Sequence, residues 1–265
     1  MIDEAQQRVR IAIDAARTAG SVLLSRWGRR GDGLATKTTS TDVVLDADRA
    51  AEAEIVRILR RRYPDDSIIA EEGSGEGERT SGHRWYVDPL DGTVNYLYGI
   101  PHFAVAIACE DARGLVAAVV YDPSRDELFT AARGNGAWLR SERLGVSTAD
   151  DLASSLVATG FAYVAEARAE QARILTGVLS HVRDIRRLGS AQLDLAYVAA
   201  SRYDAYWESV DKPWDWKAGA LLVAEAGGRV TELTQARAGH PHIVASAPLI
   251  HDDLVRLLAG AVHSA

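Results

Sequence analysis

The hydrophobic period changes twice along this chain of 265 residues, and these changes restrict the folds that the chain can adopt. Residues 3–27 and 46–62 carry apolar side chains at helical spacing, and Pro64 stops the second of these segments. Short, apolar and partly β-branched runs follow, which are typical of strands. We expect these strands at Ser67–Ala70, Arg84–Val87, Phe103–Cys109, Leu115–Tyr121, Glu127–Ala132 and Ala137–Arg140, with a hairpin turn before the last.

Strands and helices alternate in the remaining part of the chain, and this alternation predicts helices layered on a sheet. The expected strands are Ser155–Ala158, a short one near Ile185, Ala205–Glu208, Arg229–Thr231 and His242–Ala245. The expected helices are Val164–His181, Ala191–Ser201, Trp214–Ala226 and Leu249–Val262. The chain turns polar around Ser141–Asp151, so we place a domain boundary there, between an α+β half at residues 1–145 and an α/β half at 146–265.

The charge and the cysteine content argue against some classes of protein. Lysine and arginine total 30 and aspartate and glutamate total 37, which gives a net charge of −7. This acidity argues against nucleic acid as a partner, and cations would have to offset it around an anionic substrate. No uncharged apolar run reaches the roughly 18 residues that a membrane-spanning helix needs. Cys109 is the single cysteine, so no intrachain disulfide can form, which fits a cytoplasmic protein.

The segment Trp85–Thr93, with the sequence WYVDPLDGT, gives the strongest indication of chemistry. A strand ends in Asp88, and Pro89 then restricts the backbone φ angle and offers no N–H group. Asp91 follows three residues after Asp88, so the two carboxylates can converge on one point across a tight turn, with the Leu90 carbonyl between them. Oxygen ligands of this kind are the ones that Mg²⁺ prefers.

The same turn can also hold a phosphate group. Asp91, Gly92 and Thr93 begin a short helix that we expect to continue through Leu97, and the N–H groups of a first helical turn have no partners within the helix. Gly92 permits a close approach of the backbone to a ligand. The alternative is a capped turn whose acids only accept hydrogen bonds from the backbone.

Further acids stand at the ends of predicted elements, where binding sites are usually built. They are Asp48, early in a helix, Glu71 and Glu72, after a strand, Glu208, at the end of a strand, and Asp215, at the start of a helix. Each of them alone is more typical of a helix cap or a solvated acid. Together with Asp88 and Asp91 they predict a site at which several carboxylates meet.

These residues make the chain resemble the inositol monophosphatase family, within the superfamily of lithium-sensitive, Mg-dependent phosphatases. The segments that carry the resemblance are Ala70-Glu71-Glu72, Asp88–Thr93 and Trp214–Gly219. Supporting features are Lys37 ahead of the Asp48 helix, and Gly189-Ser190-Ala191 ahead of Glu208. The resemblance implies a layered αβαβα sandwich of the inositol monophosphatase and fructose-1,6-bisphosphatase type.

Carried over by position, the resemblance implies a cluster of two or three Mg²⁺ ions. Glu71, Asp88 and the Leu90 carbonyl would hold the first ion. Asp88, Asp91 and Asp215 would hold the second, so that Asp88 is shared, and Glu71 with water molecules would hold a third. Pairs of cations at such sites clamp the attacking and the leaving oxygen of a phosphoryl transfer.

The resemblance also implies roles for the other residues. Thr93 and Asp48 would orient and deprotonate the attacking water, with Glu71 as a further catalytic residue. The phosphate would lie on the N–H groups of Gly92 and Thr93, and Asp91 would also face the substrate. The polyol hydroxyls would face Ala191, Glu208 and Asp215.

The predicted reaction is therefore the Mg²⁺-dependent hydrolysis of a small polyol phosphate, with myo-inositol-1-phosphate as the first choice of substrate. The alternatives in the same superfamily are fructose-1,6-bisphosphatase, histidinol-phosphatase and 3′-phosphoadenosine nucleotide phosphatase. Asn95 resembles the inositol branch, whereas Ala70 and Tyr96 depart from the common family pattern of Gly and Phe. The resemblance also implies inhibition by lithium and a homodimer.

A different class of function stays open, namely a regulatory protein that binds RNA or the transcription machinery on the same scaffold. The arginine-rich segment Arg57–Arg62, at the end of the second predicted helix, motivates this hypothesis. The net acidity and the full set of acids argue against it.

Overall fold

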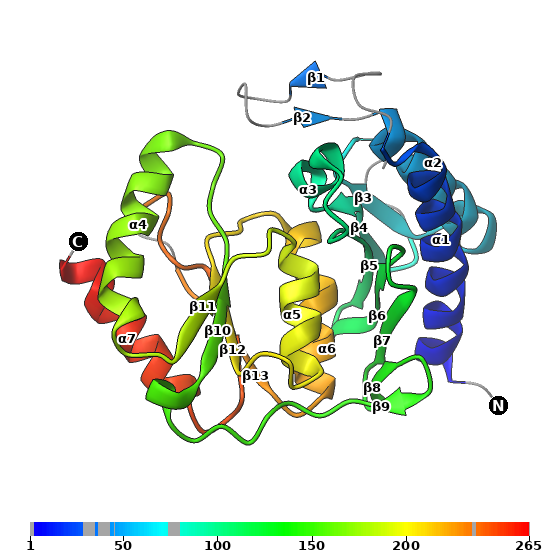
Figure 1. The fold of residues 1–265 in the computed structure, drawn as a ribbon. Coiled ribbons are helices and arrows are strands. Elements are labelled where there is room, and N and C mark those ends of the chain that lie inside the picture. The colour runs from blue at the N-terminus through cyan, green and yellow to red at the C-terminus, as the bar shows by residue number, and fades with distance from the viewer. Residues whose placement is uncertain are drawn as a thin grey trace.

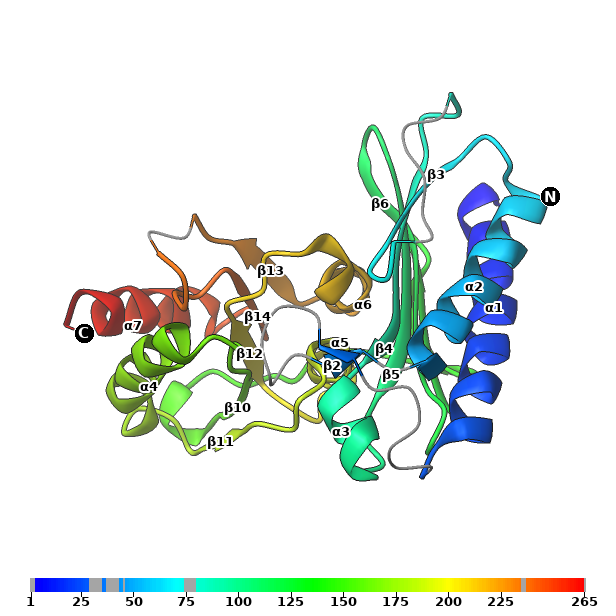
Figure 2. The ribbon, with the colours of Figure 1, turned by 90° about the horizontal axis from the view of Figure 1, so that it is seen from above.

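The computed structural model describes residues 3–28, 35–36, 43–44, 46–73, 80–234 and 237–264; Lys37 lies outside them. The described elements form alternating layers of helices and sheets, with two helices outside each sheet and two between the sheets (Figures 1 and 2). The αβαβα sandwich that the family resemblance implies is confirmed.

The N-terminal part of the chain forms the first helical layer and the first sheet. Helices α1 (Glu4–Arg26) and α2 (Asp46–Arg62) cover one face of this seven-stranded sheet (Figure 2). The strands follow chain order as β3 (Ser67–Ala70), β4 (Arg84–Asp91), β5 (Ala104–Asp111), β6 (Gly114–Asp122), β7 (Glu127–Ala132), β8 (Gly136–Leu139) and β9 (Glu142–Arg143). The pair β3–β4 is parallel, and the later pairs are antiparallel. The strands β1 (Ala35–Thr36) and β2 (Val43–Val44) form a separate antiparallel pair.

Small residues let α1 pack closely on this sheet. Ala12, Ala15 and Ala19 recur near helical spacing and are fully buried. At Gly20, an added Cβ atom would lie only 2.7 Å from the ring of Tyr121 on β6. One small-residue face of α1 therefore sets the distance between the helix and the sheet.

The C-terminal part of the chain forms the second sheet, with the strand order β11-β10-β12-β14-β13. Its strands are β10 (Leu156–Thr159), β11 (Asp184–Arg186), β12 (Ala205–Glu208), β13 (Arg229–Glu232) and β14 (Ile243–Ser246). Strand β10 is parallel to both β11 and β12, whereas the pairs of β14 are antiparallel. Helices α4 (Ala165–Leu179) and α7 (His251–Ser264) cover the outer face (Figure 1). The first sheet ends at Arg143 and the second begins at Leu156, and between them we propose the domain boundary at residue 145.

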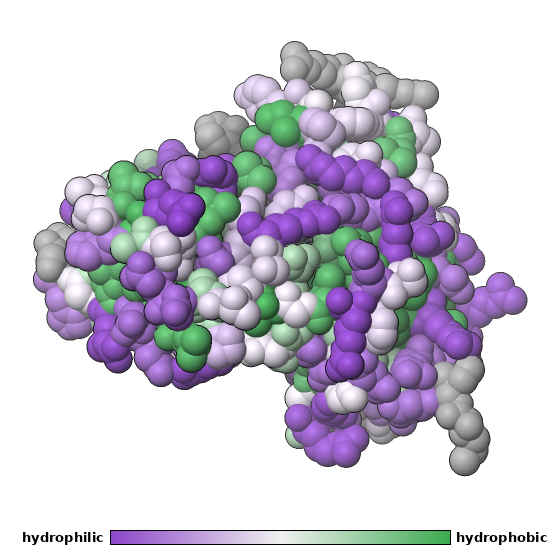
Figure 3. Space-filling model, turned by 60° about the horizontal axis from the view of Figure 1, so that its bottom comes forward, coloured by the Kyte–Doolittle hydropathy of each residue, from purple (hydrophilic) through white to green (hydrophobic). Residues whose placement is uncertain are grey.

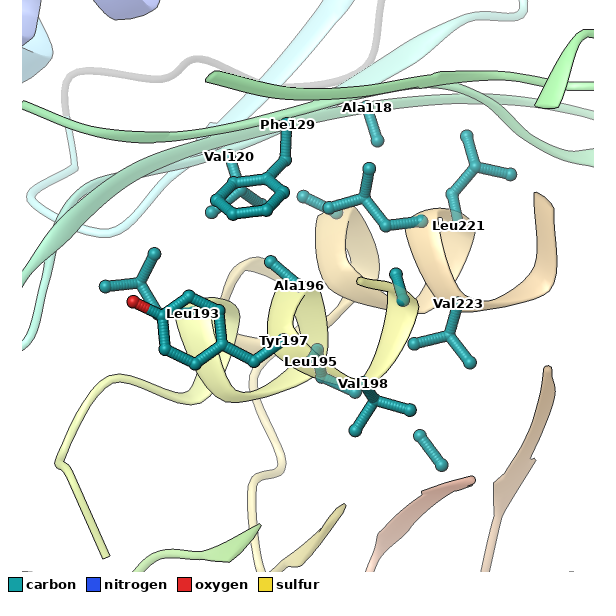
Figure 4. Close-up of a cluster of buried hydrophobic side chains, with 14 of the residues drawn as sticks. Ala118, Val120, Phe129, Leu193, Leu195, Ala196, Tyr197, Val198, Leu221 and Val223 are labelled. Carbon is teal, nitrogen blue, oxygen red and sulfur yellow. The ribbon is translucent and has the colours of Figure 1, made fainter. Parts of the chain in front are cut away.

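Helices α5 (Ala191–Ala199) and α6 (Lys217–Glu225) fill the space between the two sheets. Figure 4 shows Val120 and Phe129 of the first sheet pointing toward Leu193, Tyr197 and their neighbours on these helices. Every residue of α5 is buried, because the helix has a sheet on either side. The two sheets are therefore joined through one continuous apolar core, which fixes their carboxyl-end loops relative to one another.

The largest error in the expected elements concerns the segment from Trp214 to Ala226. The structure has a 3-10 turn at Pro213–Asp215, and α6 begins only at Lys217. Trp216 interrupts the helical backbone with φ −141° and ψ −23°. Asp215 consequently lies in a turn and not in the first turn of a regular helix.

Smaller differences concern the ends of elements. Strand β4 continues past Val87 to Asp91, because its pairing with β5 resumes at Asp91 after a shift of register that follows Asp88. Helix α4 ends at Leu179, two residues before the expected end, and α5 ends at Ala199. The short helices α3 (Thr93–Tyr98) and η1 (Leu152–Ser154) complete the fold.

The surface carries polar and apolar areas side by side. Hydrophilic residues cover much of the face in Figure 3, and apolar residues gather in smaller areas between them. Among the described residues, every helix is too short or too polar to cross a lipid bilayer.

Candidate active site

A cavity of about 440 Å³ lies where the end of β4 meets the loops of the second sheet. Asp48 and Glu72 do not line this cavity, whereas the other site residues that the sequence predicted all do. The residues that line it are Glu71, Asp88, Leu90, Asp91, Gly92, Thr93, Ala191, Glu208 and Asp215. Residues from both sheets thus reach one space, although more than 140 positions separate Glu71 from Asp215 in the chain.

The end of β4 places two of the acids. Pro89 cannot donate a ladder hydrogen bond, and the register of β4 against β5 shifts at this point. The Leu90 N–H group donates to Asp88 Oδ1 over 3.0 Å. The Thr93 hydroxyl donates to the Leu90 carbonyl over 3.0 Å, and this carbonyl oxygen keeps a second lone pair for a cation.

Gly92 is required at the start of α3 by both its backbone and its neighbours. Its φ angle of +94° lies in the left-handed region, which side chains other than glycine rarely adopt. An added Cβ atom would lie 3.0 Å from the His102 carbonyl oxygen and 3.3 Å from that of Gly189. The turn that carries Asp91 therefore packs closely against the backbone at His102 and at Gly189.

Asp91 is bound by the N-terminal end of α5. Its Oδ2 atom accepts hydrogen bonds from the Ser190 hydroxyl at 2.6 Å and from the Gln192 N–H group at 2.7 Å. Burial raises the pKa of Asp91 to about 6, although these hydrogen bonds act to lower it. This contact links the first sheet to the second through a candidate metal ligand.

The carboxylates around Asp88 repel one another. The pKa of Asp88 is raised well above its usual value, first by burial and then by the charges of its neighbours. In decreasing order, these neighbours are Glu71, Asp91, Asp215 and Asp48. Asp48 itself is fully buried on α2, and its charge also acts to raise the pKa of Asp88. Burial also raises the pKa of Asp215 well above the usual range, together with the charges of Glu71, Asp91, Glu208 and Asp211.

This set of groups has the chemistry of a site for hard cations. Carboxylate and carbonyl oxygens are the ligands that Mg²⁺ takes, and several acids cannot be ionised together in a buried space unless cations offset their charge. Among the described residues, no group of three or more acids, histidines or cysteines is already arranged as a metal site.

Glu208 lies on the opposite wall of the cavity, at the end of β12. Burial raises its pKa to about 7, although the Tyr206 hydroxyl, which donates to Glu208 Oε2 at 2.9 Å, acts in the opposite direction. At Gly160 an added Cβ atom would lie 2.0 Å from this carboxyl group, so no side chain fits there. Glu208 can accept hydrogen bonds from substrate hydroxyls at this position.

Residues 4–263 match the model of the inositol monophosphatase family. This chain belongs to the inositol monophosphatase family. The resemblance that the sequence motifs suggested is confirmed over nearly the whole chain, and members of this family are generally Mg-dependent.

Some relatives within the family are named SuhB, and others are named inositol monophosphatase. The chain is 46% identical over 236 residues to Nus factor SuhB of Escherichia coli strain K12, covering 88% of this chain and 87% of that protein. The solved extragenic suppressor protein suhB of Bartonella henselae is 40% identical, with a TM-score of 0.87 over 94% of this chain and 97% of that one. A solved inositol monophosphatase from Anabaena is 37% identical, with a TM-score of 0.84 over 97% of each chain.

Two cationic residues that line the cavity, Arg187 and Lys212, were not predicted from the sequence. The Arg187 guanidinium lies 5.8 Å from the ring centre of Phe161, another residue of the cavity wall. Arg187 stands two residues before Gly189 and Lys212 stands two before Trp214, so both flank segments that carry the family resemblance. Their closeness to those segments was the only signal in the sequence.

The metal-free protein is expected to lose stability as the pH rises from about 5 to 7.5. Burial raises the folded-state pKa of Asp91 to about 6 and that of Glu208 to about 7, and it raises the pKa of Asp88 and Asp215 well above the ordinary value of an aspartate. The folded state then binds more protons than the unfolded state, so the free energy of unfolding falls as these groups ionise. The buried His102 and His251, whose pKa burial lowers, act in the opposite direction only below about pH 6.5.

Thermal unfolding in chelator across this pH range measures the loss of stability. A loss of 1 kcal/mol in the free energy of unfolding lowers Tm by about 2–4 °C in a protein of this size. Saturating Mg²⁺ is expected to remove most of the dependence of Tm on pH, because bound cations favour the ionised carboxylates. A metal-free protein that gains stability between these pH values would contradict the assignment of the acids to one repelling cluster.

Proposed function

We propose that this protein is a Mg²⁺-dependent phosphatase that hydrolyses a small polyol phosphate monoester, with myo-inositol-1-phosphate as the preferred substrate. One observation carries the proposal: several acids from separate segments line the same cavity. They are Asp88 and Asp91 of β4, Glu71, Glu208 and Asp215 of the 3-10 turn. The mutual repulsion of these buried acids supports cation binding. The family match supports phosphate ester hydrolysis as the reaction.

Glu71, Asp88, Asp91, Asp215 and the Leu90 carbonyl would hold the two or three Mg²⁺ ions. When bound, Mg²⁺ stabilises the charge of the transferring phosphoryl group and lowers the pKa of a water molecule. The N–H groups of Gly92 and Thr93 would orient the phosphate at the end of the cavity that β4 forms.

The chain's own residues would orient the attacking water. The Thr93 hydroxyl donates its hydrogen bond to the Leu90 carbonyl. Its oxygen lone pairs therefore point elsewhere and can accept a hydrogen bond from water. Asp48, with Glu71 nearer the cavity, would take up the proton that the water releases. The oxygen of that water would form the new bond to phosphorus as the ester oxygen leaves.

The polyol would lie between Ala191, Glu208 and Asp215, with its hydroxyls donating to the two carboxylates. A substrate with a second phosphate would instead contact the cations of the wall, Arg187 and Lys212. This contrast makes the two substrates with a second phosphate, fructose-1,6-bisphosphate and 3′-phosphoadenosine 5′-phosphate, the strongest rivals. The homodimer that the resemblance implies belongs to the same proposal, and light scattering on the purified protein measures it.

A substrate panel at matched Mg²⁺ tests the assignment. It contains myo-inositol-1-phosphate, fructose-1,6-bisphosphate, histidinol phosphate and 3′-phosphoadenosine 5′-phosphate, with released phosphate as the readout. We expect kcat/KM to be about tenfold or more higher for myo-inositol-1-phosphate, which corresponds to about 1.4 kcal/mol of transition-state binding. A preference of that size for fructose-1,6-bisphosphate would reverse the order.

A second candidate function is binding to RNA or the transcription machinery. Two relatives named Nus factor SuhB, at 42% and 46% identity, favour this candidate, so the expected exclusion of nucleic acid is not supported. Arg57 and Arg61 are exposed on α2 and offer basic groups at its surface, where Arg57 pairs with Glu54 at 2.7 Å. Asp88→Asn separates the two candidates: loss of phosphate release with unchanged binding to RNA polymerase would favour the second function.

A further inference from the structure

Gln192 connects two segments of the candidate metal site. It is the second residue of α5 and is fully buried. Its backbone N–H group donates to Asp91 Oδ2 at 2.7 Å. Its side-chain Nε2 donates to the Trp214 carbonyl at 2.6 Å, and its Oε1 accepts from the Gly219 N–H group at 2.7 Å. One residue therefore binds a ligand candidate of the first sheet and both sides of the turn that carries Asp215.

The turn around Asp215 depends on these hydrogen bonds. Trp216 breaks the helical path, so the Trp214 carbonyl and the Gly219 N–H group flank an irregular backbone. The Gly219 N–H group belongs to the first turn of α6, where N–H groups lack intrahelical partners. Gln192 satisfies it, and an added Cβ at Gly219 would lie 2.3 Å from Leu195, which shows how closely α5 approaches this turn.

We propose that Gln192 is a positioning residue that sets the separation of Asp91 and Asp215, so that both carboxylates can reach the same cation. The inference rests on the proposed function and deepens it. Carboxylates that are preorganised by hydrogen-bonded neighbours bind an ion more tightly than carboxylates that must be ordered when the ion arrives. The side chain of Gln192 orders the turn of Asp215, while its backbone orders Asp91.

The test is Gln192→Met, which keeps the length of the side chain, removes both of its hydrogen bonds and leaves the backbone contact to Asp91. Calorimetric titration of the substrate-free protein with Mg²⁺ is the first readout. We expect the affinity for Mg²⁺ to fall about 10- to 100-fold, the range found when groups that orient metal ligands are lost. The Mg²⁺ concentration for half-maximal phosphate release should rise by a similar factor, while KM for substrate at saturating Mg²⁺ changes little.

Glu225→Met is the matched control on the other end of α6. The Glu225 carboxylate accepts hydrogen bonds from the Gly134 and Gly136 N–H groups, each at 2.8 Å. The control therefore also loses two hydrogen bonds that fasten α6, and its Tm should fall, but its affinity for Mg²⁺ should equal that of the unaltered protein.

The outcomes separate the inference from the proposed function. Unchanged Mg²⁺ affinity in Gln192→Met, or an equal loss in Glu225→Met, overturns the inference and leaves the proposed function standing. Absence of Mg²⁺ binding by the unaltered protein overturns both. Where Gln192→Met does not fold, Gln192→Ala, which removes the same two side-chain hydrogen bonds with a smaller side chain, takes its place with the same expected loss of affinity.

Discussion

Replacing Asp88 by asparagine is expected to lower phosphate release on the order of 10³-fold, while the metal-free variant unfolds at a higher temperature than the unaltered protein. The loss of rate corresponds to about 4 kcal/mol of transition-state stabilisation, because the shared ligand of the cation cluster would lose its charge. The gain in stability follows from burial, since Asp88 is 2% exposed and is repelled by Glu71 and Asp91. Asparagine keeps the shape and the oxygen that accepts from Leu90 N–H.

Thermal unfolding in chelator at pH 8, with the initial rate at saturating Mg²⁺, measures both effects. Asp122→Asn is the matched control, because Asp122 is equally buried but pairs with Arg125 at 2.7 Å, outside the cavity lining. That variant should lose stability and keep its rate. An Asp88→Asn protein that retained the full rate, or that was destabilised in chelator as strongly as Asp122→Asn, would contradict the cluster.

Replacing Gly92 by alanine is expected to lower the free energy of unfolding by about 2–4 kcal/mol and the rate by about 100-fold. A residue other than glycine at a φ of +94° is strained, and the new methyl group would press on the chain at His102 and Gly189. Relief of this crowding must move the turn, and a small displacement of Asp91 and Thr93 costs orders of magnitude in rate.

Gly99→Ala is the matched control at the other end of α3. Gly99 has a comparable φ of +73°, but an added Cβ atom there meets nothing within 4 Å. It should cost about 1 kcal/mol through backbone strain and leave phosphate release unchanged. Urea unfolding and initial rates at saturating Mg²⁺ measure both variants, and equal rates for the two would show that the turn at Gly92 is not part of the site.

Periodicity alone predicts most of the elements, because apolar faces recur with the spacing of helices and strands. The bounds of α2 and of β3, β7 and β12 agree with the expected ones. The helix expected at Trp214–Ala226 was wrong at its start. The apolar pattern runs through Trp216 without a break, whereas the helical backbone begins only at Lys217. The break at Trp216 is accompanied by tertiary hydrogen bonds from Gln192, which no local pattern contains.

The acids of the site could be predicted because they stand at the ends of elements, and most lie in or near the segments that carry the family resemblance. Residues that act through contacts between distant parts of the chain could not be predicted in this way. Ser190 and Gln192 reach Asp91 across about 100 positions of the chain, and Arg187 faces the cavity only because the second sheet packs against the first. Such roles follow from how the two sheets join through α5 and α6.

The most direct measurement is phosphate release from myo-inositol-1-phosphate by protein that has been stripped with chelator, before and after Mg²⁺ is returned. If the buried carboxylates collect divalent cations to activate water, turnover is absent without metal, returns fully with Mg²⁺ and falls again when Li⁺ is added. Undiminished turnover in excess chelator would contradict this account.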